Sequence, residues 1–199
     1  AAGGAASPAS GRRAPGVLRS RAMSSRCSAA SRAYVPRSVW NVIKDDLVAQ
    51  TESISMGDPT DLSHFMGAVI DDRAFAKHKA AIERAQATDG LEVIAGGQVD
   101  DSVGYFVRPT IVEIDDPTDE MFATEYFGPI LAVHVYDDAD FESVVRQMES
   151  FAPYALTGAI ISQDRAAIAW ARKELRFAAG NFYINDKPTG AVVGQQPFG

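Results

Sequence analysis

Short apolar runs and longer amphipathic segments alternate along most of the 199 residues of the chain. Apolar or alternating runs bounded by Gly, Pro, Asn or Asp are typical of β-strands, and they occur at residues 28–35, 91–95, 105–114, 130–136, 157–161 and 180–184. Apolar residues at helical spacing predict helices at residues 38–48, 71–87, 141–148 and 164–175. Strands that alternate with helices indicate an α/β fold, with a largely parallel sheet and helices on both of its faces.

Individual residues mark where these elements begin and end. Pro36 is expected to end the first strand, and Ser38 is expected to cap the helix that follows it. Asp71 or Asp72 is expected to cap the second helix. Pro109 is expected to interrupt the strand at 105–114, because proline has no N–H group for the ladder of hydrogen bonds.

The composition of the chain changes sharply near Cys27. Residues 1–26 hold five arginines and no acidic, lysine or aromatic residue, and the remainder is almost entirely Ala, Gly, Ser and Pro. Such a segment buries little apolar surface, so we expect residues 1–26 to be a disordered or non-native leader and residues 27–199 to be the domain. The same composition fits an organelle transit peptide, a linker or translated non-coding sequence, and these origins stay open.

The net charge excludes some classes of partner. The chain has 19 basic and 26 acidic residues, a net charge of −7; 19 less the five leader arginines leaves 14 basic residues and a charge of −12 in the domain. An acidic chain repels phosphate backbones and anionic lipids, so neither nucleic acid nor a membrane is an expected partner. One cysteine and no apolar run of about 20 residues favour the cytoplasm, with the mitochondrial matrix as the alternative.

The sequence lacks the common motifs for metal and nucleotide phosphate. The acid pairs at 71–72, 100–101, 115–116 and 137–138 do not have calcium-loop spacing and stand where turns or helix caps are expected. The three histidines have no partners at zinc spacing, so we expect them to pack within the fold and expect no metal. Neither G-x-G-x-x-G nor G-x-x-x-x-G-K-[ST] occurs, so we expect no phosphate-binding loop in this chain.

Cys27 is the only thiol of the chain and directly precedes the first predicted strand. The neighbouring Arg26 would favour the thiolate, which is the form that attacks carbonyl groups. A single cysteine is also compatible with a structural or incidental role, and no histidine is placed in sequence to indicate a Cys–His pair. From the residues alone both interpretations stay open.

Six short motifs occur in a fixed order. They are C-S-A at 27–29, S-R at 31–32, Y-V-P at 34–36, E-Y-F-G-P at 125–129, G-N-F-Y-I-N-D-K at 180–187 and G-Q-Q-P-F-G at 194–199. Their order and spacing resemble the C-terminal half of the aldehyde dehydrogenases. N-D-K-P-T-G-A-V-V-G-Q-Q-P-F-G at 185–199 is similar to the tract of the delta-1-pyrroline-5-carboxylate (L-glutamate γ-semialdehyde) dehydrogenase branch, which acts in proline breakdown. The resemblance covers residues 27–199 and not the leader.

The resemblance implies an aldehyde dehydrogenase catalytic domain that uses NAD. Cys27 would be the nucleophile that adds to the aldehyde as a thiohemiacetal; hydride then passes to NAD, and water releases the acid. Glu125 would hydrogen-bond the ribose on the nicotinamide side, with Phe127 beside it. Without the resemblance, Glu125 would be interpreted as an acidic residue on a surface helix.

The resemblance also implies a site for a substrate that carries a carboxylate. Ser28 would help to hold this carboxylate, and Gly190 and Ala191 would offer main-chain N–H groups to it. Phe198 would pack on the aliphatic stem of the substrate. The alternatives are a plain turn at Gly190 and a core position for Phe198.

The chain departs from the family pattern before its cysteine. Residues 23–26 are M-S-S-R where the family has a glycine-rich G-Q-K segment. The dinucleotide-binding domain, the general-base glutamate and the oxyanion-stabilising asparagine of the family also precede the cysteine. The last motif continues in the family into a strand used for homo-oligomer formation. We therefore expect an incomplete catalytic domain, truncated at both ends and without its oligomerisation elements.

Two classes of function follow from this expectation. The chain belongs to an NAD-dependent L-glutamate γ-semialdehyde dehydrogenase, or it is an inactive part of one that at most binds a partner subunit or the product carboxylate. A weaker third hypothesis is a thiol esterase, which would need no cofactor.

Overall fold

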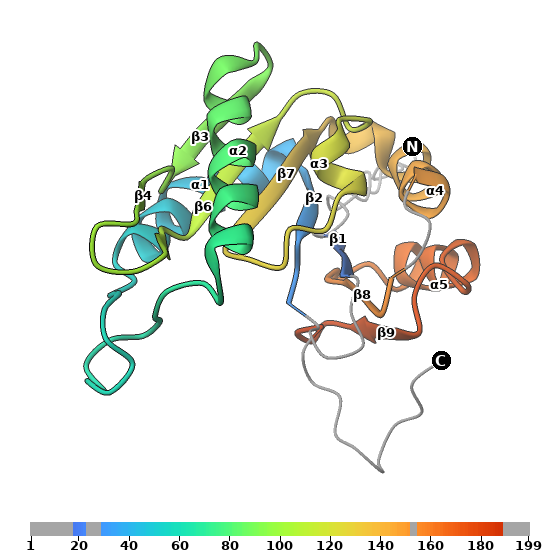
Figure 1. Cartoon of the computed structure of the whole chain (residues 1–199). Coiled ribbons are helices and arrows are strands. Elements are labelled where there is room, and N and C mark those ends of the chain that lie inside the picture. The colour runs from blue at the N-terminus through green and yellow to red at the C-terminus, as the bar shows by residue number, and fades with distance from the viewer. Residues whose placement is uncertain (1–17, 23–28, 152–154, 189–199) are drawn as a thin grey trace, which may run out of the picture.

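A seven-stranded mixed sheet forms the centre of the computed structural model, which describes residues 18–22, 29–151 and 155–188 (Figure 1). The strand order is β3-β6-β7-β2-β1-β8-β9. The strands are β1 (Leu18–Ala22), β2 (Arg32–Pro36), β3 (Leu91–Ala95), β6 (Thr110–Ile114), β7 (Ile130–Tyr136), β8 (Thr157–Ile160) and β9 (Asn181–Ile184). β1 and β3 run antiparallel to their neighbours, and the other five share one direction. The expected largely parallel sheet is confirmed.

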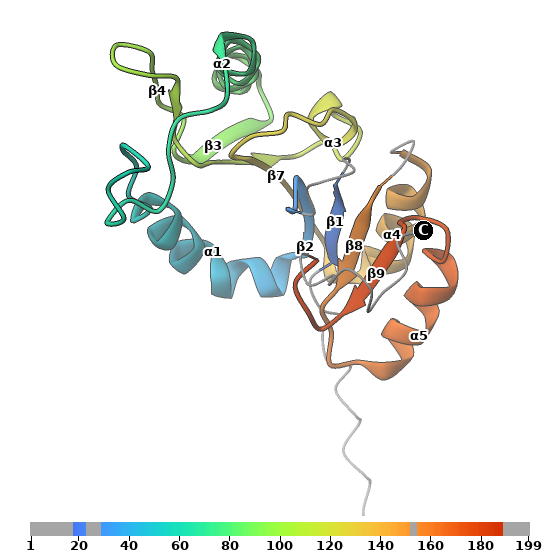
Figure 2. The ribbon, with the colours of Figure 1, turned by 60° about the horizontal axis from the view of Figure 1, so that its bottom comes forward.

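Helices cover both faces of this sheet. They are α1 (Arg37–Glu52), α2 (Asp72–Ala87), α3 (Glu120–Ala123), α4 (Phe141–Phe151) and α5 (Arg165–Glu174). Figure 2 shows α1 on the face opposite to α2 and α3. A 3-10 turn, η1 (Asp138–Asp140), precedes α4, and a separate two-stranded ribbon joins β4 (Val99–Asp100) to β5 (Phe106–Val107). The expected α/β class, with helices on both faces, is therefore confirmed.

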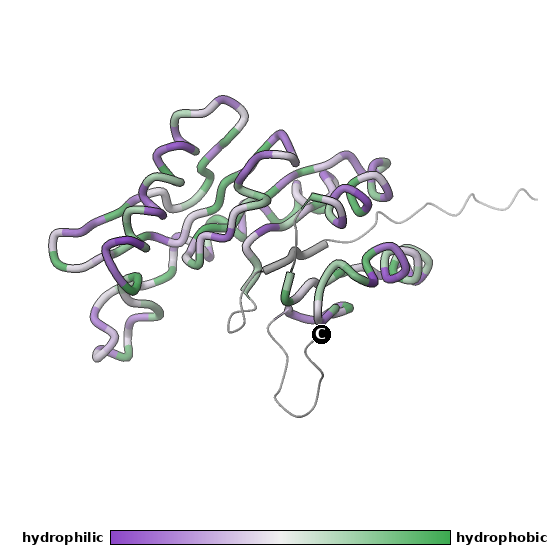
Figure 3. The backbone as a smooth tube through the Cα atoms, turned by 45° about the vertical axis from the view of Figure 1, so that its right-hand side comes forward, coloured by the Kyte–Doolittle hydropathy of each residue, from purple (hydrophilic) through white to green (hydrophobic). Residues whose placement is uncertain are grey.

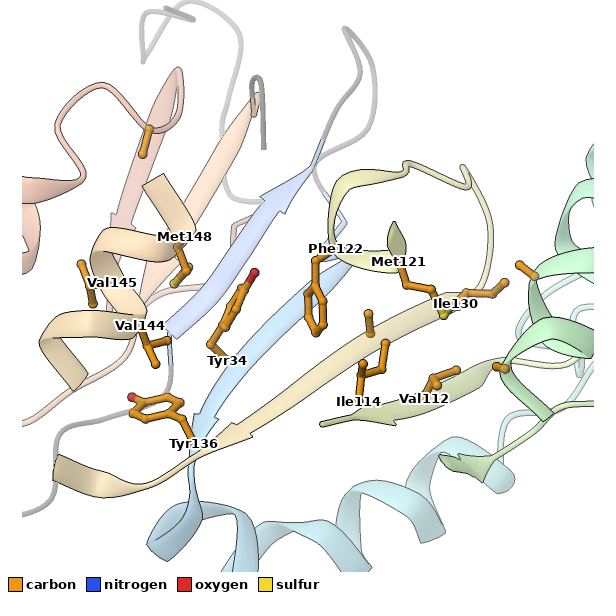
Figure 4. Packing of buried hydrophobic residues seen from close by; sticks show 14 of the residues in the cluster. Tyr34, Val112, Ile114, Met121, Phe122, Ile130, Tyr136, Val144, Val145 and Met148 are labelled. Carbon is orange, nitrogen blue, oxygen red and sulfur yellow. The ribbon is translucent and has the colours of Figure 1, made fainter. Parts of the chain in front are cut away.

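The two faces hold different apolar clusters, because side chains alternate along a strand. In β2, Tyr34 joins the larger cluster under α2 to α5, whereas Ala33 and Val35 join a smaller cluster with Trp40 of α1. Figure 4 shows the larger cluster, in which Tyr34 lies close to Phe122 of α3, with ring centroids 5.1 Å apart. Hydrophobic and hydrophilic positions alternate within the helical coils (Figure 3), as helices that bury one face require.

One predicted helix cap is confirmed and another is wrong. Asp71 caps α2 and accepts a hydrogen bond from the Ala74 N–H at 2.8 Å. Ser38 does not cap α1, because the helix begins one residue earlier, directly after the extended Pro36. The Ser38 N–H donates to Asp138 Oδ2 at 3.1 Å, so a carboxylate from η1 accepts from the first turn that Ser38 was expected to cap.

Two segments differ from the predicted elements. The run at 105–114 is divided into β5 and β6 at Arg108 and Pro109, as the proline predicts. Strand β4 and the short helix α3 were not predicted. Strand β1 lies within the segment 1–26 that was expected to be disordered; it pairs with β2 and β8, with Leu18 opposite Tyr34 and Ile160. Strand pairing uses main-chain groups and needs no apolar side chains, so composition alone did not predict it. The other leader residues lie outside the described residues.

Candidate active site

A cavity of about 230 Å³ opens where β2 and β7 begin. One wall is the segment 29–31, which leads into β2 and directly follows Cys27 and Ser28 in the sequence. The other wall is the E-Y-F-G-P loop that connects α3 to β7. On this side the cavity is lined by Glu125, Tyr126, Phe127, Gly128 and Ile130. The structure thus places Glu125 and Phe127, the two predicted cofactor residues, next to the segment that follows the predicted nucleophile Cys27.

Main-chain pairing holds the two walls together. β2 and β7 are parallel neighbours with Arg32 opposite Ala132, so both walls lie at the same edge of the sheet. The Ala132 N–H donates to the Ser31 carbonyl at 3.0 Å. The buried Arg32 guanidinium donates to the Phe122 carbonyl in α3, just before the loop.

The E-Y-F-G-P loop has a constrained backbone. Phe127 adopts φ 56°, in the left-handed region that non-glycine residues rarely occupy, and 60% of it is exposed. Residues in such conformations concentrate at ligand sites, where the surrounding structure holds them in place. Here the conformation presents an aromatic ring at the wall of the cavity.

Helix α2 supports this loop from behind. The Lys77 ammonium donates to the Glu125 carbonyl oxygen and lies 5.4 Å from the ring centroid of Tyr126. Burial raises the pKa of Tyr126, and the carboxylate of Glu120 adds to this shift. Further along α2, Arg84 Nη2 pairs with Asp119 Oδ2 at 2.5 Å. Asp119 also caps α3, so α2 fixes both the start of α3 and the loop that follows it.

His78, which follows Lys77 in α2, also lies against the loop. It is fully buried, and among the described residues neither ring nitrogen has a hydrogen-bond partner. Burial lowers the pKa of His78, and the neighbouring Lys77 charge lowers it further, so the ring is neutral at neutral pH. A Cβ atom on Gly128 would lie 2.2 Å from Nε2 of this ring. Only glycine therefore fits at this position without a shift of the loop or the ring.

The remaining predicted site residues cannot be located in the structure. Cys27, Ser28, Gly190, Ala191 and Phe198 lie outside the described residues, so their roles stay predictions. The described part of the N-D-K turn, which leads toward Gly190, follows β9: Asn185 has φ 55°, and its Oδ1 accepts from the Ser162 N–H at 2.8 Å.

Sequence reasoning did not find Lys77 or the contact of His78 with Gly128. Lys77 and Glu125 are 48 residues apart, and no local pattern connects them.

Within the described part of the chain, no three His, Cys, Asp or Glu side chains converge into a possible metal site. None of the helices in that part combines the length and apolar character that crossing a bilayer requires.

The chain belongs to the aldehyde dehydrogenase family, whose model ("Aldehyde dehydrogenase family") matches residues 19–199. The match begins at residue 19, so the resemblance starts earlier in the chain than the expected residue 27. A relative from Danio rerio, "Delta-1-pyrroline-5-carboxylate dehydrogenase, mitochondrial", is 50% identical over 175 residues, which are 87% of this chain and 32% of the relative.

Solved structures of a delta-pyrroline-5-carboxylate dehydrogenase are also similar to this chain. A crystal structure of the Mycobacterium tuberculosis delta-pyrroline-5-carboxylate dehydrogenase has a TM-score of 0.82 and 55% identity, and covers 88% of this chain and 32% of the other. A structure of that enzyme bound with NAD has a TM-score of 0.80 and 53% identity, and covers 88% and 31% of the two chains. This chain therefore spans about a third of the length of these relatives.

Proposed function

We propose that this chain carries the nucleophile and part of the cofactor site of an NAD-dependent dehydrogenase that oxidises L-glutamate γ-semialdehyde to L-glutamate in proline breakdown. The observation that carries the proposal is the cavity at the start of β2 and β7, where Glu125 and Phe127 face the segment that follows Cys27. Identity of 50–55% to delta-1-pyrroline-5-carboxylate dehydrogenases supports the choice of substrate.

The residues around the cavity fit one end of a dinucleotide. A carboxylate such as that of Glu125 can accept hydrogen bonds from ribose hydroxyls, and the exposed ring of Phe127 offers an apolar face beside it. The volume of about 230 Å³ is below the ~300–1,000 Å³ of complete ligand sites, so the cavity suits the nicotinamide and its ribose only. When bound, NAD would supply the hydride acceptor of the reaction.

Cys27 would do the covalent chemistry. Its thiolate adds to the aldehyde carbon, which forms a C–S bond and leaves the charge on the former carbonyl oxygen. After the carbon has lost hydride, the same sulfur holds the acyl group as a thioester. Water adds to this thioester, the C–S bond breaks, and the carboxylic acid and the free cysteine are released.

Two segments of the chain would hold the substrate carboxylate. We assign this role to Ser28 and to the main-chain N–H groups of Gly190 and Ala191, with Phe198 on the aliphatic stem. Main-chain N–H groups on a loop suit a carboxylate because no side chain blocks their approach. In the sequence, Gly190 and Ala191 follow the N-D-K turn at the end of β9.

The second candidate is an inactive chain, favoured by its coverage of only 32% of the length of the Danio rerio relative. We propose that the 199-residue chain does not reduce NAD by itself. In the complete enzyme we expect homo-oligomers. The name of this relative includes the word "mitochondrial", which supports the mitochondrion rather than the cytoplasm as its location, and we propose the matrix.

The test compares the chain alone with the chain joined to the parts of the Mycobacterium tuberculosis relative that lie on either side of the matched region. NADH formation from glutamate γ-semialdehyde is expected only for the joined enzyme and should be abolished by Cys27→Ser. Glu125→Gln should raise the KM for NAD, whereas Glu142→Gln, an exposed change on α4, should not. A folded joined enzyme without turnover would contradict the proposed activity, and turnover by the chain alone would contradict its proposed inactivity.

A further inference from the structure

Lys77 makes two contacts with the E-Y-F-G-P loop from outside the cavity. Its ammonium donates to the carbonyl oxygen of Glu125 and lies 5.4 Å from the ring centroid of Tyr126, the next residue. In Figure 1 the connection from α3 to β7 passes beside the first turns of α2, where Lys77 is located. One side chain thus contacts two consecutive residues of the loop.

The contacts of Lys77 support the loop without occupying the carboxylate that we assign to the cofactor. Lys77 bonds the main-chain oxygen of Glu125, so this contact does not engage the carboxylate that we assign to the cofactor. Phe127, two residues further on, has a left-handed backbone that needs support from its surroundings. Gly128 then packs against the buried His78, directly after Lys77 in α2. The loop is therefore fixed at its start by Lys77 and at its end by His78.

We propose that Lys77 is a positioning residue for the cofactor half of the site: it holds the main chain of Glu125 so that Glu125 and Phe127 stay at the wall of the cavity. This inference rests on the proposed function. Lys77 itself is exposed and is not among the residues that line the cavity, so it acts through Glu125 and not on the reacting atoms. Its loss should weaken NAD binding more than it slows the chemistry at Cys27.

Lys79 provides a matched control. It is the same residue type on the same helix, also exposed, and its ion pair is with Glu83 one turn later at 4.0 Å. Lys77→Met and Lys79→Met remove the same charge from α2. Lys77→Arg retains the cation and a donor, and should preserve both contacts with the loop.

The first measurement is hydrogen–deuterium exchange of the 199-residue chain at the amides of residues 125–128. Lys77→Met should speed exchange there, while Lys79→Met and Lys77→Arg should leave it near the unsubstituted rate. Unchanged exchange in Lys77→Met, or an equal increase in Lys79→Met, would overturn the proposal whatever the activity of the enzyme.

The second measurement uses the joined enzyme described above. Lys77→Met should raise the KM for NAD by roughly three- to tenfold, with a smaller change in kcat and in the KM for the semialdehyde. Lys77→Arg should restore most of the loss. Equal increases in both KM values would mean a general loss of structure and would overturn the positioning role. Absence of turnover in the unsubstituted enzyme would instead overturn the proposed function and the cofactor half of this inference, and the exchange data would still decide whether Lys77 holds the loop.

Discussion

Replacement of Gly128 by alanine should destabilise the protein through a single collision. The new Cβ would lie 2.2 Å from both Cε1 and Nε2 of His78, whereas real Cβ contacts essentially never fall below 3.0 Å. The loop or the ring must therefore move by close to 1 Å. Because His78 is fully buried, the ring has no open space to enter, and overpacking of this kind costs about 1–3 kcal/mol of the free energy of unfolding.

Urea denaturation of the 199-residue chain, followed by circular dichroism, measures this cost. Gly67→Ala is the matched control, since its Cβ would meet the nearest atoms only at 3.6 Å, and it should change the free energy of unfolding by less than about 0.5 kcal/mol. His78→Ala should lower stability by leaving a cavity, but it removes the atoms with which the Cβ added at position 128 would collide.

The decisive comparison is therefore the double variant. With alanine at position 78, the change Gly128→Ala should cost almost nothing, which corresponds to a coupling energy of at least about 1 kcal/mol between the two sites. If Gly128→Ala costs the same with and without the His78 ring, the collision is not the reason for glycine at this position.

Three further predictions concern the charge of His78, the cap of α5 and the predicted substrate loop. The pKa of His78 is below its usual 6.5 in the folded state, so the unfolded chain binds more protons between the two values, and stability should fall as pH decreases below about 6.5. Urea midpoints from pH 8 to pH 5 should show a shallower fall in His78→Leu than in the unsubstituted chain, and an equal fall in both would contradict this role of His78. Asp164 caps α5 by accepting two N–H bonds at 2.8 and 3.1 Å, so Asp164→Ala should lower the thermal midpoint by an amount equivalent to about 1 kcal/mol, and no shift would contradict the capping role. In the completed enzyme, Gly190→Pro should raise the KM for glutamate γ-semialdehyde by roughly tenfold or more, and the KM for propionaldehyde far less; equal losses at unchanged folding would make this loop structural.

The order of elements could be predicted because their signals are local. Apolar alternation in β2 and β7 and the Asp71 cap of α2 each depend on residues within one or two turns of chain. The Ser38 cap failed for a reason outside that range, since the carboxylate that serves the first turn of α1 comes from Asp138, 100 residues later.

Some residues of the candidate site could likewise be predicted from a local motif, and others could not. Glu125 and Phe127 could be found because they belong to a contiguous motif, whereas Lys77 and His78 act on that motif across about 50 residues of intervening chain. A lysine followed by a histidine on an amphipathic helix has no signature that separates it from any other helical surface. Only the packing of α2 against the loop reveals the connection.

The parallel pairing of β2 with β7 has a consequence for how this site can change. The spacing between its two walls is set by main-chain hydrogen bonds, which do not depend on side-chain identity. Substitutions at residues 29–31 and at Tyr126 can therefore alter the shape and polarity of the cavity while its frame stays in place. Such a frame allows the lining to change one residue at a time, so these positions are suitable for randomised libraries that alter the binding of the proposed cofactor.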